Sequence, residues 1–309
     1  MEFKRGQNFA RVEGILSEID LKYNSYVKNG VTVESIGGMV KVLVETEVDG
    51  TMTALEVPLY QFSTKYKKDG NINPAYTAIE KVMNEFSSIA SCGSKEQADK
   101  VRANGVIKMN EFPGQNGKIV SQPRVQANFI SRVVGDFNPE AKFELEFMVS
   151  KIARAVDKEG VEIDPARLNI EVIVPQYTSP SETTMNVDLV KLNAYAPNVV
   201  NAIENYWEAG SCYKAAGRLN FSSRTEEVVE ELGFGEAQKR TRTVNVNELV
   251  VTGGSEVPLE GDFAFDFDQI KAGMAARAQR LEDLKSGKVS KAKQTPAQDS
   301  SKGKFNLGF

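Results

Sequence analysis

Residues 100–133, KVRANGVIKMNEFPGQNGKIVSQPRVQANFISRV, have the pattern of two long strands joined by a loop that contains an Asn-Gly turn signal. Side-chain alternation predicts a small, apolar face that carries Val101, Ala103, Gly105, Ile107, Met109, Val125, Ala127, Phe129 and Val133. The opposite face is predicted to be basic and rich in amides, and it carries Arg102, Asn104, Lys108, Arg124, Gln126, Asn128 and Arg132. Such a face suits a long, negatively charged ligand, and the alternative is an ordinary solvated strand surface.

Charge is distributed unevenly along the chain of 309 residues, whose net charge is −4 and whose pI is about 5.3. A basic total would argue directly for nucleic acid, and its absence argues mildly against it. Residues 1–135 nevertheless carry 17 lysines and arginines against 15 aspartates and glutamates, whereas residues 136–222 carry 8 against 13. An anion site is therefore expected in the first third of the chain.

Several classes of chemistry lack the residues they need. The sequence contains no histidine, which removes the usual general base and the commonest metal ligand, and Cys92 and Cys212 do not have metal-ligand spacing. We therefore expect no catalytic residue, no cofactor and no metal site. The chain has neither an apolar run long enough to span a membrane nor a signal-peptide pattern, so a reduced, cytoplasmic protein is expected.

The same order of elements occurs twice. Three predicted strands, of which the last two form a hairpin around Asp49-Gly50, precede a helix that Asn73-Pro74 opens and that runs to about Phe86. Strands at 143–156, 167–175 and 183–193 precede a helix opened by Pro197-Asn198. Three short matches support a duplication: ILSEI (15–19) with MVSKI (148–152), AIEKVM (78–83) with AIENYW (202–207), and VRANGVI (101–107) with YKAAGRL (213–219).

Three strands, a helix and further strands is the order of an OB-fold, a five-stranded Greek-key barrel. We therefore predict a mainly β protein with short helices, built from two tandem OB-like barrels and a C-terminal extension; the competing architecture is two unrelated α+β domains. Gly105 and Gly217 are expected at bends or bulges. The expected domains are 1–135, 136–222, an extension at 223–285 and a disordered tail at 286–309.

The last third has a different character. Residues 222–240 have the pattern of a helical linker, 241–254 of a strand, and 266–288 of a helix capped by Asp266 or Asp268. The acidic-aromatic run 260–268 has three interpretations: a capped helix start, a docking segment for a partner protein, or a DNA mimic that folds back onto the basic face.

Three stretches resemble single-stranded DNA-binding proteins of bacteriophages that infect Gram-positive bacteria: NEFPGQNGKIVSQPRVQANFISRV (110–133), NYWEAGSCYKAAGRLNF (205–221) and NELVVTGGSEVPLEGDF (247–263). The resemblance implies OB-type folds, sequence-independent binding and protection of single-stranded DNA in replication or recombination, and a location in the host cytoplasm. Bacterial single-strand binders usually end in an acidic tip, whereas this chain ends in the basic SKGKFNLGF. The docking role of such a tip is therefore assigned to the acidic-aromatic run and Phe309.

A single-strand binder needs cations for phosphates and aromatic rings for bases. The predicted phosphate contacts are Lys22, Lys28, Lys65, Lys67, Lys68, Arg102, Lys108, Lys118, Arg124 and Arg132. The predicted stacking residues are Tyr23, Tyr26, Tyr66 and Phe112, and the second barrel offers Lys151, Arg154, Tyr177, Lys214 and Arg218. The predicted partner-binding residues are Phe263, Phe265, Phe267 and Phe309, whereas Tyr60, Phe62, Phe129 and Trp207 are assigned to the core.

Two further function classes stay open at this point. A structural or assembly protein would use the paired barrels as protein-interaction modules, and it would have no need for a basic strand face. An enzyme without histidine would need paired carboxylates or an activated cysteine, and the sequence shows no second group placed to activate either cysteine. Non-enzymatic binding of single-stranded DNA is the hypothesis we carry forward, with partner proteins at the C-terminal region.

Overall fold

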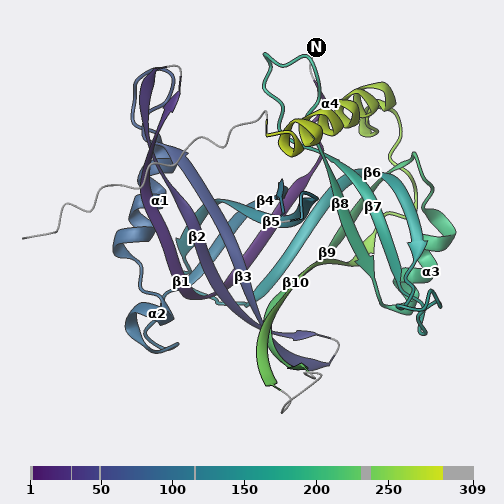
Figure 1. Cartoon of the computed structure of the whole chain (residues 1–309), viewed down its shortest axis with the longest axis horizontal. Coiled ribbons are helices and arrows are strands. Elements are labelled where there is room, and N and C mark those ends of the chain that lie inside the picture. The colour runs from purple at the N-terminus through teal and green to yellow at the C-terminus, as the bar shows by residue number, and fades with distance from the viewer. Residues whose placement is uncertain (1–2, 29, 49, 115, 231–237, 288–309) are drawn as a thin grey trace, which may run out of the picture.

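In the computed structural model, the described residues form ten strands, four α-helices and one 3-10 turn (Figure 1). The structure describes residues 3–28, 30–48, 50–114, 116–230 and 238–287, of which 48, 222–230 and 238–245 are described by their backbone alone. The strands are β1 (Asn8–Lys28), β2 (Val31–Val48), β3 (Thr51–Thr64), β4 (Lys100–Pro113), β5 (Ile119–Arg132), β6 (Glu140–Arg154), β7 (Leu168–Pro175), β8 (Val187–Ala194), β9 (Cys212–Glu230) and β10 (Gln238–Gly254). The helices are α1 (Pro74–Glu85), α2 (Ile89–Cys92), α3 (Pro197–Tyr206), the 3-10 turn η1 (Gly261–Phe263) and α4 (Phe267–Lys285).

The strand pairings close two barrels of the same topology. In barrel one, β1 pairs with β2 and β4, β2 pairs with β3, β3 pairs in parallel with β5, and β4 pairs with β5. In barrel two, β6 pairs with β7 and β9, β7 with β8, β8 in parallel with β10, and β10 with β9. A helix lies between the third and fourth strand of each barrel, which is the OB-fold order. The predicted fold, mainly β with two tandem OB-like barrels, is confirmed.

Irregularities of the strand register occur at equivalent places in the two barrels. The register of the first strand skips Ser17 in β1 and Ser150 in β6, the same serine in the matched sequences ILSEI and MVSKI. The register of the fifth strand skips Asn128 in β5 and Thr252 in β10. A bulge adds one residue and bends its strand, which is how a short sheet curls into a barrel.

Gly105 and Gly217 lie opposite these fifth-strand bulges, as their place in the sequence predicted. A Cβ on Gly105 would lie 2.2 Å from the carbonyl oxygen of Gln126, and one on Gly217 would lie 2.1 Å from that of Val250. Neither position has room for a side chain, so glycine permits the close backbone approach that the curved sheet requires.

The helices begin and end where the sequence indicates. The Asn73 side chain accepts a hydrogen bond from the amide of Ala75, and Pro74 occupies the first turn of α1. Trp207, at the end of α3, is buried and stacks on Tyr213 with 5.3 Å between ring centroids, and its indole N–H donates to the carbonyl of Ser255 at 2.8 Å. The prediction that Trp207 belongs to the core is confirmed.

Residues 22–28 continue β1 and form a hairpin arm with β2. One segment differs from the sequence-based expectation. Residues 222–230, expected in a helical linker, continue β9, and β10 begins at Gln238. The expected boundary at residue 222 is therefore too early, because β10 supplies the fifth strand of barrel two. The division of the chain into domains otherwise remains a proposal.

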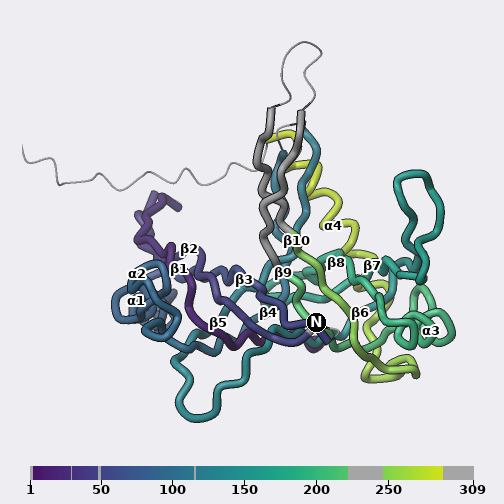
Figure 2. Tube along the Cα trace, turned by 90° about the horizontal axis from the view of Figure 1, so that it is seen from below, coloured from purple at the N-terminus to yellow at the C-terminus, as the bar shows by residue number. Residues whose placement is uncertain are grey.

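The barrels are joined by strand pairing and by helix α4. Residues 8–13 of β1 pair with residues 140–145 of β6, so that one sheet runs through both barrels. Figure 2 shows the barrels next to each other with α4 beside their junction. Ile270 of α4 is buried against Val187 and Met185 of barrel two, in a small separate core. Among the described residues, no helix is long and apolar enough to cross a membrane.

Candidate nucleic-acid interface

Four of the predicted phosphate-binding cations are engaged in ion pairs within the protein. Lys22 pairs with Asp20 at 2.9 Å and Lys65 with Glu34 at 2.8 Å. Both lysines belong to hairpins or turns at the end of barrel one where α1 begins. An ion-paired lysine has its charge compensated, and a phosphate must compete with the carboxylate for it, so these two residues are weak candidates.

Arg102 faces outward on β4, as predicted, but it neutralises a buried acid. Its Nε donates to Glu13, whose side chain is 1% exposed, at 2.6 Å. Burial alone would raise the pKa of the Glu13 carboxyl, but hydrogen bonds from Arg102 and from the amide of Asn138 hold that pKa below its ordinary value. Arg102 is therefore needed by the fold, because its removal would leave a buried carboxylate without its main partner.

Arg132 holds the end of helix α1. Its guanidinium donates to both oxygens of Asp99, at 2.8 and 3.0 Å, and to the carbonyl of Glu85 in the last turn of α1. The same group lies 4.3 Å from the centroid of the Phe86 ring. The side chain predicted to be among the strongest phosphate contacts is thus occupied by a helix cap and a bidentate ion pair.

Within the part of the chain that the structure describes, the other six predicted cations of barrel one have no carboxylate within ion-pair distance. The six are Lys28, Lys67, Lys68, Lys108, Lys118 and Arg124. Lys108 and Arg124 are cross-strand partners on β4 and β5, and the Arg124 guanidinium lies 5.5 Å from the centroid of the Tyr60 ring. Uncompensated cations can attract phosphates, and an adjacent aromatic ring can stack on a base.

Aromatic side chains line the outer surface of β3 and β5 next to Arg124. Tyr60 pairs with Gln126 across the two parallel strands, and Phe62 and Phe129 follow in the same chain direction. The side chains of Phe62 and Phe129 are 55% and 61% exposed. We call Tyr60, Phe62 and Phe129 the aromatic strip. Arg124, over Tyr60, joins this strip to the paired Lys108.

The assignments of Phe62 and Phe129 to the core are wrong, and Tyr60, also assigned to the core, is half-buried on the outer surface. Asn128 is an extra residue on β5, so the alternation slips by one position and Ile130 is buried where Phe129 was expected. On β3 the buried positions are Leu55, Val57, Leu59, Gln61 and Ser63. The alternation of β3 could have shown that Phe62 faces outward, but the polar Gln61 and Ser63 on the core face disguised it.

The predicted stacking residues lie away from the aromatic strip. The Tyr23 hydroxyl donates to Glu80 of α1 at 2.9 Å, which fixes the ring against that helix. Tyr66 lies in the turn after β3, beneath the ammonium group of Lys65. Tyr26 on the β1–β2 arm and Phe112 near the tip of the β4–β5 arm are half-buried. Their role as stacking platforms stays a prediction.

Arg154 and Lys214, two predicted contacts in barrel two, pair with acids of the protein. Arg154 donates to Glu204 at 2.7 and 3.1 Å and to Glu162 at 3.0 Å, and these hydrogen bonds raise its pKa. Lys214 lies 3.5 Å from Glu144.

The remaining candidates of barrel two occupy three different places. Lys151 is exposed on β6, and Arg218 lines a hollow beside Tyr195. Tyr177, which follows β7, is 63% exposed and lies 4.9 Å from the guanidinium of Arg5. Of these three, Tyr177 alone lines a hollow together with residues of barrel one.

On the corresponding face of barrel two, the guanidinium of Arg167 lies 5.2 Å from the centroid of the Tyr195 ring, and Arg218 lines the hollow beside that ring. The parallel strand pairs Leu59–Val125 in barrel one and Leu192–Leu249 in barrel two occupy equivalent positions, so they align β3 and β5 with β8 and β10. On this alignment Tyr60, Phe62, Arg124 and Phe129 correspond to Asn193, Tyr195, Glu248 and Gly253. Burial, with Glu248 beside it, raises the pKa of the Tyr195 hydroxyl to about 12. Barrel two thus carries an acid where barrel one carries Arg124, which agrees with the more acidic composition of the second third.

The acidic-aromatic run forms the start of α4. Asp266 caps the helix by accepting a hydrogen bond from the amide of Gln269 at 2.8 Å, and this confirms the capped-helix interpretation. Phe265, predicted to contact a partner, is instead buried in the core beneath α4, where its amide donates to the Cys212 sulfur. Phe263 and Phe267 are exposed, and their docking role stays a prediction. Phe309 and the tail 288–309 lie outside the described residues.

The repeated topology and its aromatic-basic face define the chain as a tandem OB-fold protein. More particularly, it belongs to the YorF family, whose model matches residues 7–287. No curated protein matches the chain.

Solved structures with a similar course of the chain were also found. The wild-type single-stranded DNA binding protein from Thermus aquaticus has 12% identity and a TM-score of 0.47, over 84% of this chain and 96% of that one. A deletion mutant of the same protein has 13% identity and a TM-score of 0.45, over 83% and 97%. The Plasmodium falciparum SSB in complex with ssDNA has 15% identity and a TM-score of 0.24, over 41% and 100%. At these values the fold assignment rests on the strand pairings above.

Proposed function

We propose that this chain is a non-enzymatic, sequence-independent binder of single-stranded DNA, as its resemblance to phage single-strand binders implies. One observation carries the proposal: the aromatic strip Tyr60, Phe62 and Phe129 lies beside Arg124 and Lys108, whose charges no described carboxylate compensates. Flat rings accept unpaired bases of any sequence, and uncompensated cations attract phosphates.

A duplex does not fit this chemistry equally well. Exposed rings on a strand surface bind the faces of bases, and a duplex hides those faces in its stack. The preference for a single strand therefore follows from the rings, whereas the cations would attract either form of DNA. A role in protecting single strands during replication or recombination, in the cytoplasm of a host bacterium, is part of the same proposal.

The test is fluorescence anisotropy with a labelled mixed-sequence single strand of about 30 nucleotides, long enough for both barrels. A duplex and an RNA of the same sequence serve as comparisons. We expect tight single-strand binding that weakens with salt, and weak duplex binding. Absence of single-strand binding at low salt would overturn the proposal, and the barrels would then be treated as protein-interaction modules.

The salt dependence identifies the phosphate contacts. Each contact contributes about −0.7 to the slope of log K against log salt for single strands, so Lys108→Ala with Arg124→Ala should flatten the slope by about 1.4. Lys158→Ala with Lys191→Ala, two exposed lysines of barrel two, is the matched control and should leave the slope unchanged. Equal slopes for the wild type and the first double variant would remove these residues from the site.

A further inference from the structure

A polar groove lies between the two barrels, next to the proposed site. It has a volume of about 420 Å³, and residues from barrel one, barrel two and helix α4 line it. Lys108 and Arg124 belong to barrel one, Gln176 and Tyr177 follow β7 of barrel two, and Arg280 comes from α4. We call this hollow the interbarrel groove. Arg124 connects it to the aromatic strip, because the guanidinium that lines the groove also lies over the Tyr60 ring.

The groove has an excess of positive charge. Three cations, Lys108, Arg124 and Arg280, line it together with two carboxylates, Glu111 and Asp188. Glu111 is already held by the buried guanidinium of Arg277, so Arg280, at 2.8 Å, is a second partner for one negative charge. The Asp188 carboxylate accepts a hydrogen bond from the amide of Met109 at 3.0 Å. Burial, with Glu111 nearby, raises the pKa of the Asp188 carboxyl.

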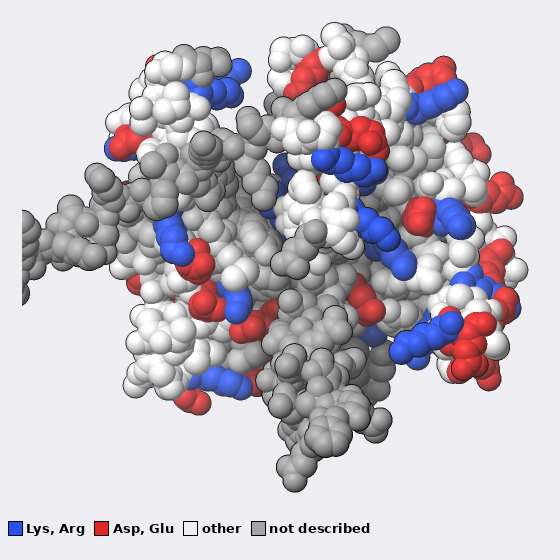
Figure 3. Space-filling view, in the orientation of Figure 1, with Lys and Arg blue, Asp and Glu red and all other residues white. Residues whose placement is uncertain are grey.

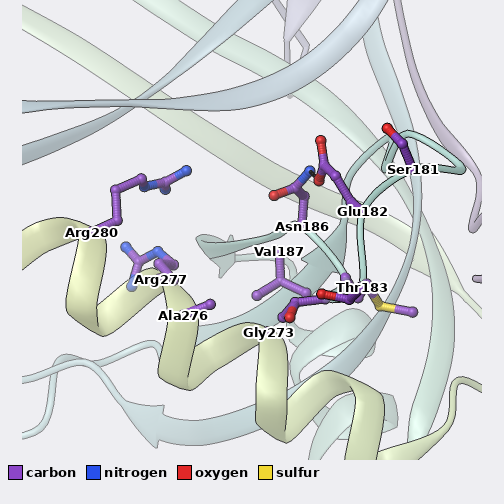
Figure 4. Close-up of a pocket in the computed structure, with 11 residues that line it drawn as sticks. Ser181, Glu182, Thr183, Asn186, Val187, Gly273, Ala276, Arg277 and Arg280 are labelled. Atoms are coloured by element: carbon purple, nitrogen blue, oxygen red, sulfur yellow. Dashed lines mark hydrogen bonds between the residues drawn. The ribbon is translucent and has the colours of Figure 1, made fainter.

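Arg280 is placed where it can serve a ligand without releasing the helix. Figure 4 shows Arg277 and Arg280 projecting from α4 near Asn186 and Val187, in a neighbouring hollow of about 310 Å³. The two hollows share Asn186, Val187 and Arg280, so Arg280 lies at their junction. Its side chain is about half exposed, whereas that of Arg277 is 10% exposed. Arg277 therefore anchors α4 to Glu111, and Arg280 remains accessible to a phosphate.

Tyr177 supplies an aromatic platform on the barrel-two side. Its ring is 63% exposed, and the guanidinium of Arg5 lies 4.9 Å from its centroid. An arginine on one face of a ring holds the ring in place and leaves the other face for a planar group. The amides of Asn110, Gln176 and Asn186 add hydrogen-bonding groups to the groove. Figure 3 shows lysine and arginine side chains on the visible face below α4, where the barrels meet.

We propose that the interbarrel groove holds one nucleotide unit of the bound single strand, with its base on Tyr177 and its phosphate on Arg280 and Lys108. The inference rests on the proposed function and extends it, because it carries the strand from barrel one to barrel two and makes α4 part of the binding surface. Barrel two then contributes to binding through its junction with barrel one.

The test is a length series of oligodeoxythymidylates of about 6, 10, 16 and 24 nucleotides, which brackets the roughly 4–16 nucleotides that one OB barrel covers. Wild-type affinity should rise once the strand is long enough to leave barrel one. Tyr177→Ala should lose this rise, by about 5- to 150-fold on the long strands for one stacked base, and should bind the shortest strand as the wild type does. Arg280→Gln should behave in the same way with a smaller loss.

Two controls separate the possible outcomes. Tyr206→Ala removes a tyrosine that is exposed at the end of α3, away from the groove, and should bind every length as the wild type does. A thermal melt of Arg280→Gln checks that Arg277 still holds the helix.

Three results would count against the inference or against the function itself. Long-strand binding by Tyr177→Ala at wild-type strength would overturn the inference and leave the proposed function intact. An equal loss at all lengths would also overturn it, because Tyr177 would then belong to the barrel-one site. Failure of the wild type to bind any length would overturn the proposed function itself. 5-Iododeoxyuridine placed at successive positions of the strand should photo-crosslink to Tyr177 from the positions that extend beyond barrel one. If no such position crosslinks to Tyr177, the strand does not run from barrel one into the interbarrel groove.

Discussion

Truncation of the aromatic strip is the most direct perturbation of the proposed site. Phe62→Ala and Phe129→Ala each remove one exposed ring from the outer surface of barrel one. One stacked base contributes about 1–3 kcal/mol, so each substitution should weaken single-strand binding by about 5- to 150-fold. Because the two rings are 55% and 61% exposed, their loss should change the free energy of unfolding by no more than about 0.5 kcal/mol.

The assay is anisotropy with a labelled single strand, at one fixed salt concentration, alongside a thermal melt of each variant. Phe267→Ala is the matched control, since Phe267 is 60% exposed but lies on α4. Phe62→Tyr should keep most of the affinity and Phe62→Leu should lose it, because stacking needs a flat ring and not only an apolar side chain. If folded Phe62→Ala and Phe129→Ala bind as tightly as the Phe267→Ala control, these two rings do not stack on bases.

Two further predictions concern the scaffold. Arg132→Ala should lower the free energy of unfolding by about 1 kcal/mol at neutral pH and leave single-strand binding unchanged. Burial alone would raise the pKa of Asp99, but the hydrogen bonds from Arg132 and Ser87 hold it below its ordinary value. The ion pair stabilises the fold above the unfolded-state pKa of Asp99, and this stabilisation is lost as the pH falls through the folded-state pKa. The free energies of unfolding of the wild type and Arg132→Ala should therefore converge in acid. Urea titrations at several pH values check this, and a difference in unfolding free energy that stays constant with pH would contradict it. Gly105→Ala and Gly217→Ala should each cost about 1–3 kcal/mol, because the added Cβ would overlap a carbonyl oxygen, whereas Gly253→Ala, with nothing within 4 Å, should melt like the wild type.

Much of the fold could be predicted because its signals are local. The Asn73-Pro74 helix start, the Asp49-Gly50 hairpin and the glycine of each fourth strand depend on residues that are close together in the sequence. The duplication was also visible, because both copies keep the same apolar positions and the same bulged serine. Alternation correctly placed Val101, Ala103 and Ile107 inside barrel one.

The site was predicted less well, because its residues depend on register and on distant partners. A single bulge at Asn128 turns Phe129 outward, and no local pattern announces an extra residue in a strand. Arg102 meets Glu13 from 89 positions away, and Arg132 meets Asp99 across the end of a helix. Four cations that look equivalent to Lys108 and Arg124 in the sequence thus differ from them in having an internal counter-charge.

The sequence by itself determined the barrel type, its duplication and the third of the chain that carries the basic face, because periodicity, turn residues and composition are properties of contiguous segments. Only the tertiary structure decided which cations are uncompensated, which rings face the solvent, and that Lys108, Tyr177 and Arg280 surround one groove. The physical reason is that charge compensation and exposure depend on neighbours in space, and these neighbours come from strands and helices up to 172 positions apart.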